Sequence, residues 1–447
     1  TYLSAPGASA REGEARRIPA YLRVIPEGPI MQGVPAGQRS FLGSRLVAVE
    51  GCSLDEVLDR VAALQACENL YDRYTRLRIG FGEERFMRRL FPQLGDSLHL
   101  SLLTPSGSRL SLSLPFLPAA EADAVPKAWC PTARAVPRGQ LAYQFMDADK
   151  QVMMINIDQI SARENFEYMS EHGWSGYKTQ LPAFYRTLGR EMPADTLQAI
   201  GQLPSFSGVF GRMLREMKQH RSSTLIIDLR SNGGGWTGIT LPTLYQLYGR
   251  RYLETDLSDR FYRLLSPLYL EKLNTTLEEF NRSNGADWQL GDYTFSIPAA
   301  GGLSGDALCE RFVRGCMSSV REELAAQQGE PLYTPRHVYV VTDANTFSAA
   351  FHYAFYLWKM GATVVGVPSR QAPNTFMEVT PFRLPRTGLE GSISNSMQVF
   401  LPPADRRAKV FYPDLIPTYD DYRAARFDNE AEIIFLLKSI GLPGLPE

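Results

Sequence analysis

The sequence predicts an α/β fold, because two buried strands each lead through a short turn into a helix. The first strand, 224–230, has four apolar residues out of seven and is bounded by polar residues. The second, 338–342, is apolar and β-branched, and the helix-forming stretch 349–360 follows closely. Alternating leucines in two further segments predict a pair of half-buried strands in a separate N-terminal part, at 98–103 and 110–114.

Ser348 lies at the junction between the second strand and its helix, in the run Thr-Phe-Ser-Ala-Ala. A side chain at a helix start faces backbone N–H groups without intrahelical acceptors and the positive end of the helix dipole. Acyl-transfer enzymes place a nucleophile in this position, since the same amides can bind the oxyanion that forms on attack. The alternative is that Ser348 serves only as the N-cap of the helix.

The first strand runs into Ser-Asn-Gly-Gly-Gly-Trp at 231–236, and a second helical stretch follows. Three consecutive glycines cost conformational entropy, and they permit a positive φ or a close approach of the backbone to a ligand. A turn of this kind can direct an N–H group into a cleft. A merely flexible loop fits less well, because the loop is short and its flanks are strongly apolar.

Together these segments resemble the tail-specific (C-terminal-processing) serine peptidase family. The resemblance covers roughly residues 150–430, and the segments that carry it are 228–234, 342–350, 364–368 and 413–414. It implies a catalytic domain of the ClpP/crotonase type, with Ser348 as the nucleophile. It also implies that the oxyanion hole uses the backbone N–H groups of Ala349 and Gly234.

An N-terminal PDZ-like domain is expected upstream of the catalytic part. The stretch 42–51 looks like the strand and turn of such a domain, and Ser53 with Glu56 forms a capping box at the start of a helix. The fold expected overall is a PDZ-like domain with a helical insertion, followed by a ClpP/crotonase-like domain. The expected divisions are an N-terminal segment (1–37), the PDZ-like domain (38–120) with its insertion at about 68–95, a proline-rich linker (121–140) and the peptidase domain (141–447).

The general base is harder to find in the sequence. One branch of the family uses a lysine after the strand that here is 363–367, but 368–373 contains no lysine. Arg370 cannot replace it, because a guanidinium does not deprotonate at working pH. The other branch uses a histidine in a motif ending His-Thr, and this chain begins Thr1-Tyr2-Leu3. The resemblance therefore implies a histidine immediately before Thr1.

Other candidates for the triad lie within the sequence. His352, four residues after Ser348 on the same helical face, is the fallback base, and His172 on a predicted loop is a further candidate. The resemblance implies a carboxylate or amide well after the serine, and Asp405 is the tentative choice; the alternative is an ordinary loop carboxylate. Asp228 and Arg230 are expected to form a structural pair.

Composition limits the possible partners. Lys and Arg total 47 and Asp and Glu total 48, so bulk charge favours neither nucleic acid nor a membrane surface. No apolar run approaches the roughly 18 residues that span a bilayer. Five cysteines show no metal-type spacing, and Cys309 could pair with Cys316 or all could be reduced.

The resulting expectation is a serine endopeptidase that acts on polypeptides through an acyl-enzyme, with no metal, nucleotide or other cofactor. The resemblance favours an extracellular or periplasmic location, and oligomeric state cannot be read from the sequence. A competing interpretation is an inactive relative that binds an apolar ligand or a peptide, because no base is evident.

Overall fold

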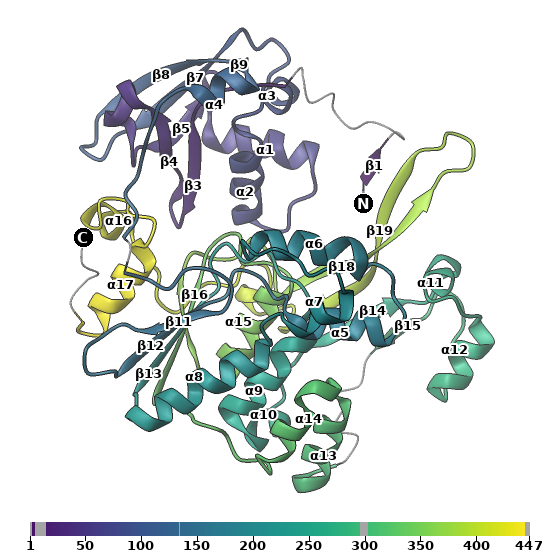
Figure 1. The fold of residues 1–447 in the computed structure, drawn as a ribbon. Coiled ribbons are helices and arrows are strands. Elements are labelled where there is room, and N and C mark those ends of the chain that lie inside the picture. The colour runs from purple at the N-terminus through teal and green to yellow at the C-terminus, as the bar shows by residue number, and fades with distance from the viewer. Residues whose placement is uncertain (1, 5–14, 134, 296–302, 443–447) are drawn as a thin grey trace. The chain divides into compact units, whose positions relative to one another are not determined.

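The computed structural model describes residues 2–4, 15–133, 135–295 and 303–442 (Figure 1). The chain divides into two compact units. The larger contains residues 16–255, 302–371 and 412–447, and the smaller contains 1–15, 256–301 and 372–411. Each mixes helices and strands, in agreement with the predicted α/β class.

The N-terminal part of the larger unit is built on a seven-stranded sheet of order β10-β4-β5-β7-β8, in which β3 pairs with β4 and β6 with β5. Its strands are β3 (Tyr21–Ile25), β4 (Gly28–Pro35), β5 (Arg45–Val49), β6 (Cys52–Ser53), β7 (Ser97–Leu103), β8 (Arg109–Pro115) and β10 (Lys127–Trp129). A small ribbon pairs β2 (Arg16–Arg17) with β9 (Leu117–Pro118). The two strands predicted from alternating leucines are thus confirmed as β7 and β8.

Helices α1 (Leu54–Leu64), α2 (Leu70–Gly80), α3 (Glu84–Leu90) and α4 (Ala119–Ala124) accompany this sheet, with the short 3-10 helix η2 (Ala36–Phe41). The predicted capping box is present at the start of α1, where Ser53 N donates to Glu56 Oε2 over 2.7 Å. Helices α2 and α3 occupy the segment expected to be a helical insertion. The expected domain boundaries themselves stay a prediction.

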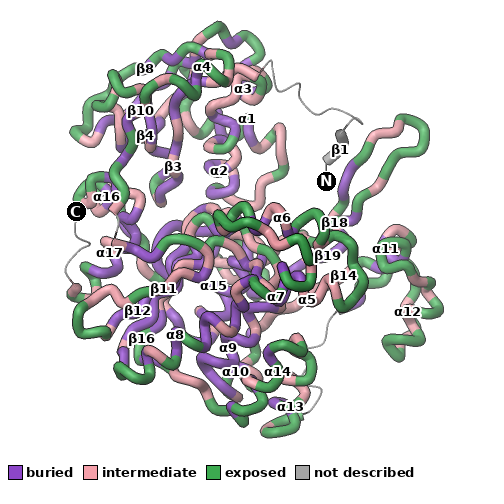
Figure 2. Tube along the Cα trace, in the orientation of Figure 1, coloured by how far each residue is buried: buried purple, intermediate pink, exposed green. Residues whose placement is uncertain are grey.

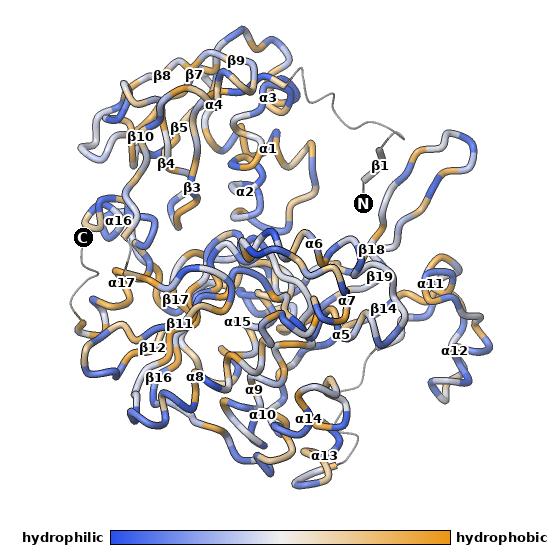
Figure 3. The backbone as a smooth tube through the Cα atoms, viewed as in Figure 1, coloured by the Kyte–Doolittle hydropathy of each residue, from blue (hydrophilic) through white to orange (hydrophobic). Residues whose placement is uncertain are grey.

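The second sheet of the larger unit has the order β11-β12-β13-β16-β17. Its strands are β11 (Ala142–Phe145), β12 (Val152–Asn156), β13 (Thr224–Asp228), β16 (His337–Thr342) and β17 (Thr363–Gly366). The last four run parallel to one another, and β11 is antiparallel to β12. The central strands are buried and rich in branched apolar residues, as expected for a parallel sheet covered on both faces (Figures 2 and 3).

The helices of this part bury their apolar faces against this second sheet, against the N-terminal sheet or against one another. They are α5 (Arg163–Glu171), α6 (Tyr177–Thr187), α7 (Thr196–Gly201), α8 (Phe206–His220), α9 (Leu241–Tyr248), α10 (Arg250–Glu254), α13 (Gly305–Gly315), α14 (Ser318–Ala325), α15 (Ala349–Lys359), α16 (Tyr419–Ala424) and α17 (Ala431–Ser439), with the 3-10 helix η3 (Thr237–Thr240). Helix α15 follows β16 and is almost entirely buried.

The smaller unit is an antiparallel sheet of order β1-β19-β14-β15, with β18 also paired to β19. Its elements are β1 (Tyr2–Ser4), β14 (Arg260–Leu264), β15 (Tyr293–Phe295), β18 (Asn374–Arg383), β19 (Glu390–Val399), helices α11 (Pro267–Lys272) and α12 (Leu277–Asn284), and the 3-10 helix η4 (Arg406–Ala408). Strands β18 and β19 form its long hairpin (Figure 1).

Two further expectations concern the chain as a whole. In the ranges that the structure describes, no helix combines the length and the apolar character needed to cross a membrane. All five cysteines are free thiols. The possible disulfide between Cys309 and Cys316 is therefore not formed.

Candidate active site

The parallel register of the second sheet brings the two predicted loops together. Strands β13 and β16 are neighbours, and their paired residues run from Thr224 with His337 to Asp228 with Val341. Because parallel strands end at the same edge of a sheet, the glycine loop after β13 and the serine loop after β16 emerge side by side. Residues more than a hundred positions apart thus meet at one edge.

Ser348 occupies a strained turn at the start of α15. Its φ is 55° and its ψ is −125°, in the positive-φ region that non-glycine residues rarely adopt. A sharp strand-to-helix turn of this kind exposes the nucleophile in other serine hydrolases. The Ser348 side chain makes no capping hydrogen bond to α15. The hydroxyl is therefore not used for capping, which argues against the purely structural interpretation.

The glycine loop packs directly against Ser348. A Cβ placed on Gly234 would lie 2.6 Å from Ser348 Cβ, 2.8 Å from the Phe347 carbonyl oxygen and 3.0 Å from Ala349 N. Gly234 also has a φ of 106°, and Gly235 would place a Cβ only 2.0 Å from the Ile160 carbonyl oxygen. Two of the three glycines are thus required by close backbone packing.

The structure brings together the predicted nucleophile, Ser348, and the two predicted oxyanion donors, Gly234 and Ala349. Ala349 is the first residue of α15, so its N–H has no intrahelical acceptor, and among the described residues it makes no other backbone hydrogen bond, as an oxyanion donor requires. Gly234 N–H, however, donates to Asn232 Oδ1 over 2.9 Å. In this conformation one predicted donor is free and the other is engaged within its own loop.

Buried polar side chains hold the two loops in place. Asn232 is fully buried: its side-chain Nδ2 donates to the Ile157 carbonyl over 2.7 Å, and its backbone carbonyl accepts from Phe347 N over 3.0 Å. Asp343 Oδ1 accepts from Ser231 N over 2.9 Å. Thr346 Oγ1 donates to the Leu229 carbonyl over 2.9 Å. Every one of these bonds crosses between segments distant in sequence, so the loop geometry depends on tertiary contacts.

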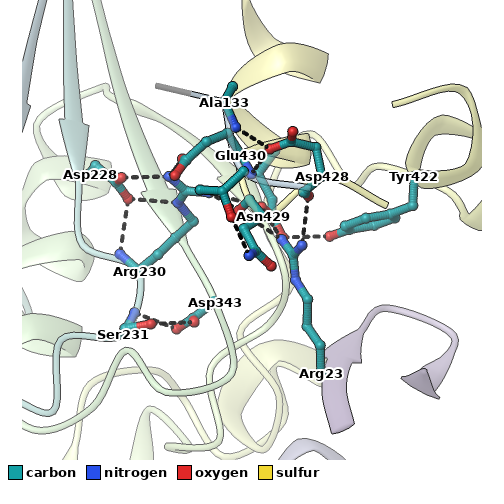
Figure 4. A network of polar contacts seen from close by, with 12 residues as sticks. Arg23, Ala133, Asp228, Arg230, Ser231, Asp343, Tyr422, Asp428, Asn429 and Glu430 are labelled. Atoms are coloured by element: carbon teal, nitrogen blue, oxygen red, sulfur yellow. Dashed lines mark hydrogen bonds and ion pairs between the residues drawn. The ribbon is translucent and has the colours of Figure 1, made fainter. Parts of the chain in front are cut away.

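A buried network of ions supports the base of the glycine loop (Figure 4). Arg230 pairs with Asp228 over 2.7 Å, as the sequence suggested, and also with Glu430 and with Glu432 over 3.0 Å. Glu432 is 1% exposed and accepts from Arg23 of β3 over 2.7 Å. One carboxylate on α17 therefore joins the N-terminal sheet to the strand that leads into the glycine loop.

A polar cavity of about 370 Å³ lies beside this network. Its lining includes Arg23, Arg78, Arg230 and Asp343 but neither Gly234 nor Ser348. The cavity is therefore separate from the candidate nucleophile.

The candidate bases lie in different environments. His352 is buried on α15, and its Nδ1 lies 2.9 Å from Thr237 Oγ1. His172 is exposed and stacks on Tyr168, whose ring lies 4.6 Å from that of Trp236, the residue that follows the three glycines. Thr1, next to which the resemblance implies a histidine, lies outside the described residues.

Asp405, the candidate acid, belongs to the smaller unit and caps η4. Its carboxylate accepts from Arg407 N over 2.8 Å and from Arg407 Nη2 over 2.8 Å. The hydrogen bond from the Arg407 side chain, followed by that from its backbone, lowers the pKa of Asp405 from 3.8 to about 2. The carboxylate is therefore ionised at neutral pH, as an orienting acid must be, but it already has a cationic partner.

Gln371 was missed in the sequence. It is 2% exposed, and its Oε1 accepts the backbone N–H of Ser348. A lone glutamine after a strand carries no periodicity or motif, so the only available signal was its position in the segment where another branch of the family has its lysine.

Comparison with known proteins identifies the family. Residues 199–397, which include both loops, match the family model of Peptidase family S41. This part of the chain resembles an S41 peptidase domain. The match confirms the tail-specific peptidase family and a serine-type hydrolase expected from the sequence. No protein of curated function matches the chain.

Solved structures show the same fold for the S41 domain and its N-terminal neighbour. Mature CPAF complexed with lactacystin has a TM-score of 0.52 at 12% identity, over 95% of this chain and 83% of that chain. A crystal structure of mature CPAF has a TM-score of 0.51 at 12% identity, over 97% of this chain and 84% of that chain. At this identity the likeness shows the fold alone. The ClpP-like catalytic domain preceded by an N-terminal domain is thereby confirmed.

Proposed function

We propose that this S41 peptidase is an endopeptidase that cleaves polypeptides through an acyl-enzyme on Ser348. The observation that carries the proposal is the packing of Gly234 against a strained, uncapped Ser348 whose neighbour Ala349 offers a free N–H. A non-catalytic binding protein would have no need for a strained serine at this point. The match to a peptidase family likewise favours the enzyme over the binding module.

The proposed reaction follows from these positions. Ser348 Oγ attacks the carbonyl carbon of the peptide bond while a base accepts the hydroxyl proton. The carbonyl oxygen becomes an oxyanion, held by Ala349 N–H and by the glycine loop at Gly234. The carbon–nitrogen bond then breaks, and the base returns the proton to the leaving amine. Water attacks the resulting ester in the same way and releases the carboxylate product and the free serine.

Covalent labelling tests the nucleophile. We expect a fluorophosphonate or a peptidyl chloromethyl ketone to add one adduct to the full-length protein, seen by intact-mass spectrometry. Ser348→Ala should remove the adduct, and Ser394→Ala, which changes a serine on β19, should leave it in place. An adduct that persists in Ser348→Ala, or none on the wild type, would contradict the assignment.

The base is proposed to be a histidine adjacent to Thr1, with His352 as the fallback and Asp405 as the orienting acid. Because His352 Nδ1 already faces Thr237 Oγ1, we expect His352→Asn, which retains an acceptor at that position, to keep kcat within about tenfold of the wild type. Loss of a true base costs far more, roughly 10⁴-fold or greater. A drop of that size, measured with a quenched fluorescent peptide and not reproduced by Thr237→Val, would transfer the role to His352.

The proposal also includes where the protein acts and where its domains begin and end. An extracellular or periplasmic site of action fits an S41 peptidase, and the PDZ-like domain, linker and catalytic domain retain the boundaries expected from the sequence. Expression of the full-length protein followed by cell fractionation tests the location, and the protein is expected in the periplasmic or extracellular fraction.

Limited proteolysis tests the domain boundaries, with cleavage expected within 121–140.

A further inference from the structure

Gln371 is an unusual buried polar side chain beside the proposed nucleophile. It is 2% exposed, and within the described part of the chain its Nε2 has no hydrogen-bond partner. Leaving a buried amide donor unpaired costs on the order of 1–3 kcal/mol, so such groups call for an explanation. The cost is expected to be recovered when a ligand supplies the missing acceptor.

The hydrogen bond to Oε1 determines the orientation of the Gln371 side-chain amide. Oε1 accepts the backbone N–H of Ser348. A flipped amide would place NH₂ against that N–H, two donors facing each other, so the flip is excluded. The unpaired group is therefore the NH₂. It is bonded to the same carbon as Oε1, the atom that accepts from the Ser348 backbone nitrogen.

The backbone around Gln371 is held firmly. Gln371 N donates to Ser369 Oγ over 2.9 Å, and the Ser369 hydroxyl donates to the Thr346 carbonyl in the serine loop. Arg370 N donates to the Ala344 carbonyl over 3.2 Å. The segment is thus attached to the loop that carries Ser348, and its side chain is preorganised rather than free to rotate.

The expected oxyanion hole lacks a donor that Gln371 can supply. Ala349 N–H is free, but Gly234 N–H is engaged by Asn232 Oδ1 over 2.9 Å. A side-chain amide can do the same work as a backbone N–H, provided that it is fixed before the reaction begins.

We propose that Gln371 is a catalytic residue whose Nε2 donates a hydrogen bond to the substrate carbonyl oxygen as it becomes an oxyanion on attack by Ser348. No bond to Gln371 is made or broken: its NH₂ keeps both hydrogens and stabilises the negative charge electrostatically. The same side chain positions Ser348 through Oε1. This inference rests on the proposed function and extends it to a residue outside both sequence motifs.

Two substitutions test the donor role, and the pH dependence of Gln371→Glu separates it from the positioning role. Gln371→Glu keeps an oxygen acceptor for Ser348 N–H but replaces the NH₂ donor with a second acceptor, and Gln371→Met removes both functions. We expect each variant of the full-length enzyme to lose about 10²- to 10³-fold in kcat with KM changed by less than about threefold, the loss typical of one oxyanion donor. In Gln371→Glu the activity relative to the wild type should rise as the pH falls, because a protonated carboxyl regains a donor.

The control is Gln246→Met on α9, another fully buried glutamine with one unpaired amide atom, whose Nε2 donates to the Ser207 carbonyl over 3.1 Å. It should keep its kcat. Wild-type kcat in Gln371→Glu, or in Gln371→Met, would overturn the donor assignment. If Gln371→Glu does not fold, the kcat and KM of Gln371→Met decide. Fluorophosphonate labelling of wild type and Ser348→Ala runs in parallel, so failure of the nucleophile is distinguished from failure of Gln371.

Discussion

Gly234→Ala is expected to reduce kcat/KM for peptide cleavage by at least about 100-fold. The added methyl group would meet Ser348 Cβ at 2.6 Å and the Phe347 carbonyl at 2.8 Å, and the residue has a φ of 106° that L-residues avoid. The glycine loop must then move away from the nucleophile. Displacements of about 1 Å from reactive geometry cost roughly 100-fold.

Gly233→Ala provides a matched control one residue away. Nothing lies within 4 Å of a Cβ at this position, and its backbone is outside the positive-φ region. Its kcat/KM should stay within about threefold of the wild type, because alanine fits there without displacing any atom. Initial rates with a quenched fluorescent peptide compare the two variants. Equal losses in both would show that the loop is sensitive to any added bulk and that contact with Ser348 is not the cause.

Glu432→Gln is expected to lower the free energy of unfolding by about 3–5 kcal/mol, the typical cost of breaking a buried ion pair. The carboxylate is 1% exposed and is shared by Arg23 and Arg230, whose side chains are 14% and 12% exposed, so neutralising it leaves two largely buried guanidinium groups with less compensation. Urea denaturation followed by tryptophan fluorescence measures the effect. Glu278→Gln, which breaks the exposed pair with Arg282 on α12, should change stability by less than about 1 kcal/mol.

The same carboxylate predicts a pH dependence. Burial raises the pKa of Glu432, but Arg23 and Arg230 more than offset this and bring it from 4.5 to about 2. Because the pKa is lower in the folded state, the stabilisation is complete above about pH 4.5 and is lost as the pH falls toward 2. The stability difference between wild type and Glu432→Gln should therefore shrink across this window. A constant difference would contradict the assignment of the shift to Glu432.

Much of the fold could be predicted from local pattern. Strands β13 and β16 were evident because a parallel strand is buried on both faces and therefore reads as a short apolar run. The capping box at Ser53 and Glu56 was evident because its two hydrogen bonds are made within a single turn. The strand-to-helix turns that carry Ser348 and the three glycines were also predicted correctly, because each sequence motif spans only a few residues.

Other features could not be read in this way. The resemblance predicted Gly234 as a donor, but the engagement of its N–H by Asn232 depends on a local backbone conformation that three glycines leave open. The multiple partners of Arg230, one of them shared with Arg23 of β3, could not be foreseen beyond Asp228, because Glu430 and Glu432 lie some two hundred positions away. Gln371 could not be predicted, because no sequence motif links its position to that of Ser348.

The sequence by itself therefore indicated the α/β class through strand and helix patterns, and through its resemblance to a known family it indicated the peptidase family and Ser348 as the candidate nucleophile. Only the tertiary structure decided that Gly234 packs on Ser348, that the serine adopts a strained φ without capping its helix, and that Gln371 holds the serine amide. The physical reason is the parallel pairing of β13 with β16, which fixes the distance between two loops that the chain itself leaves far apart.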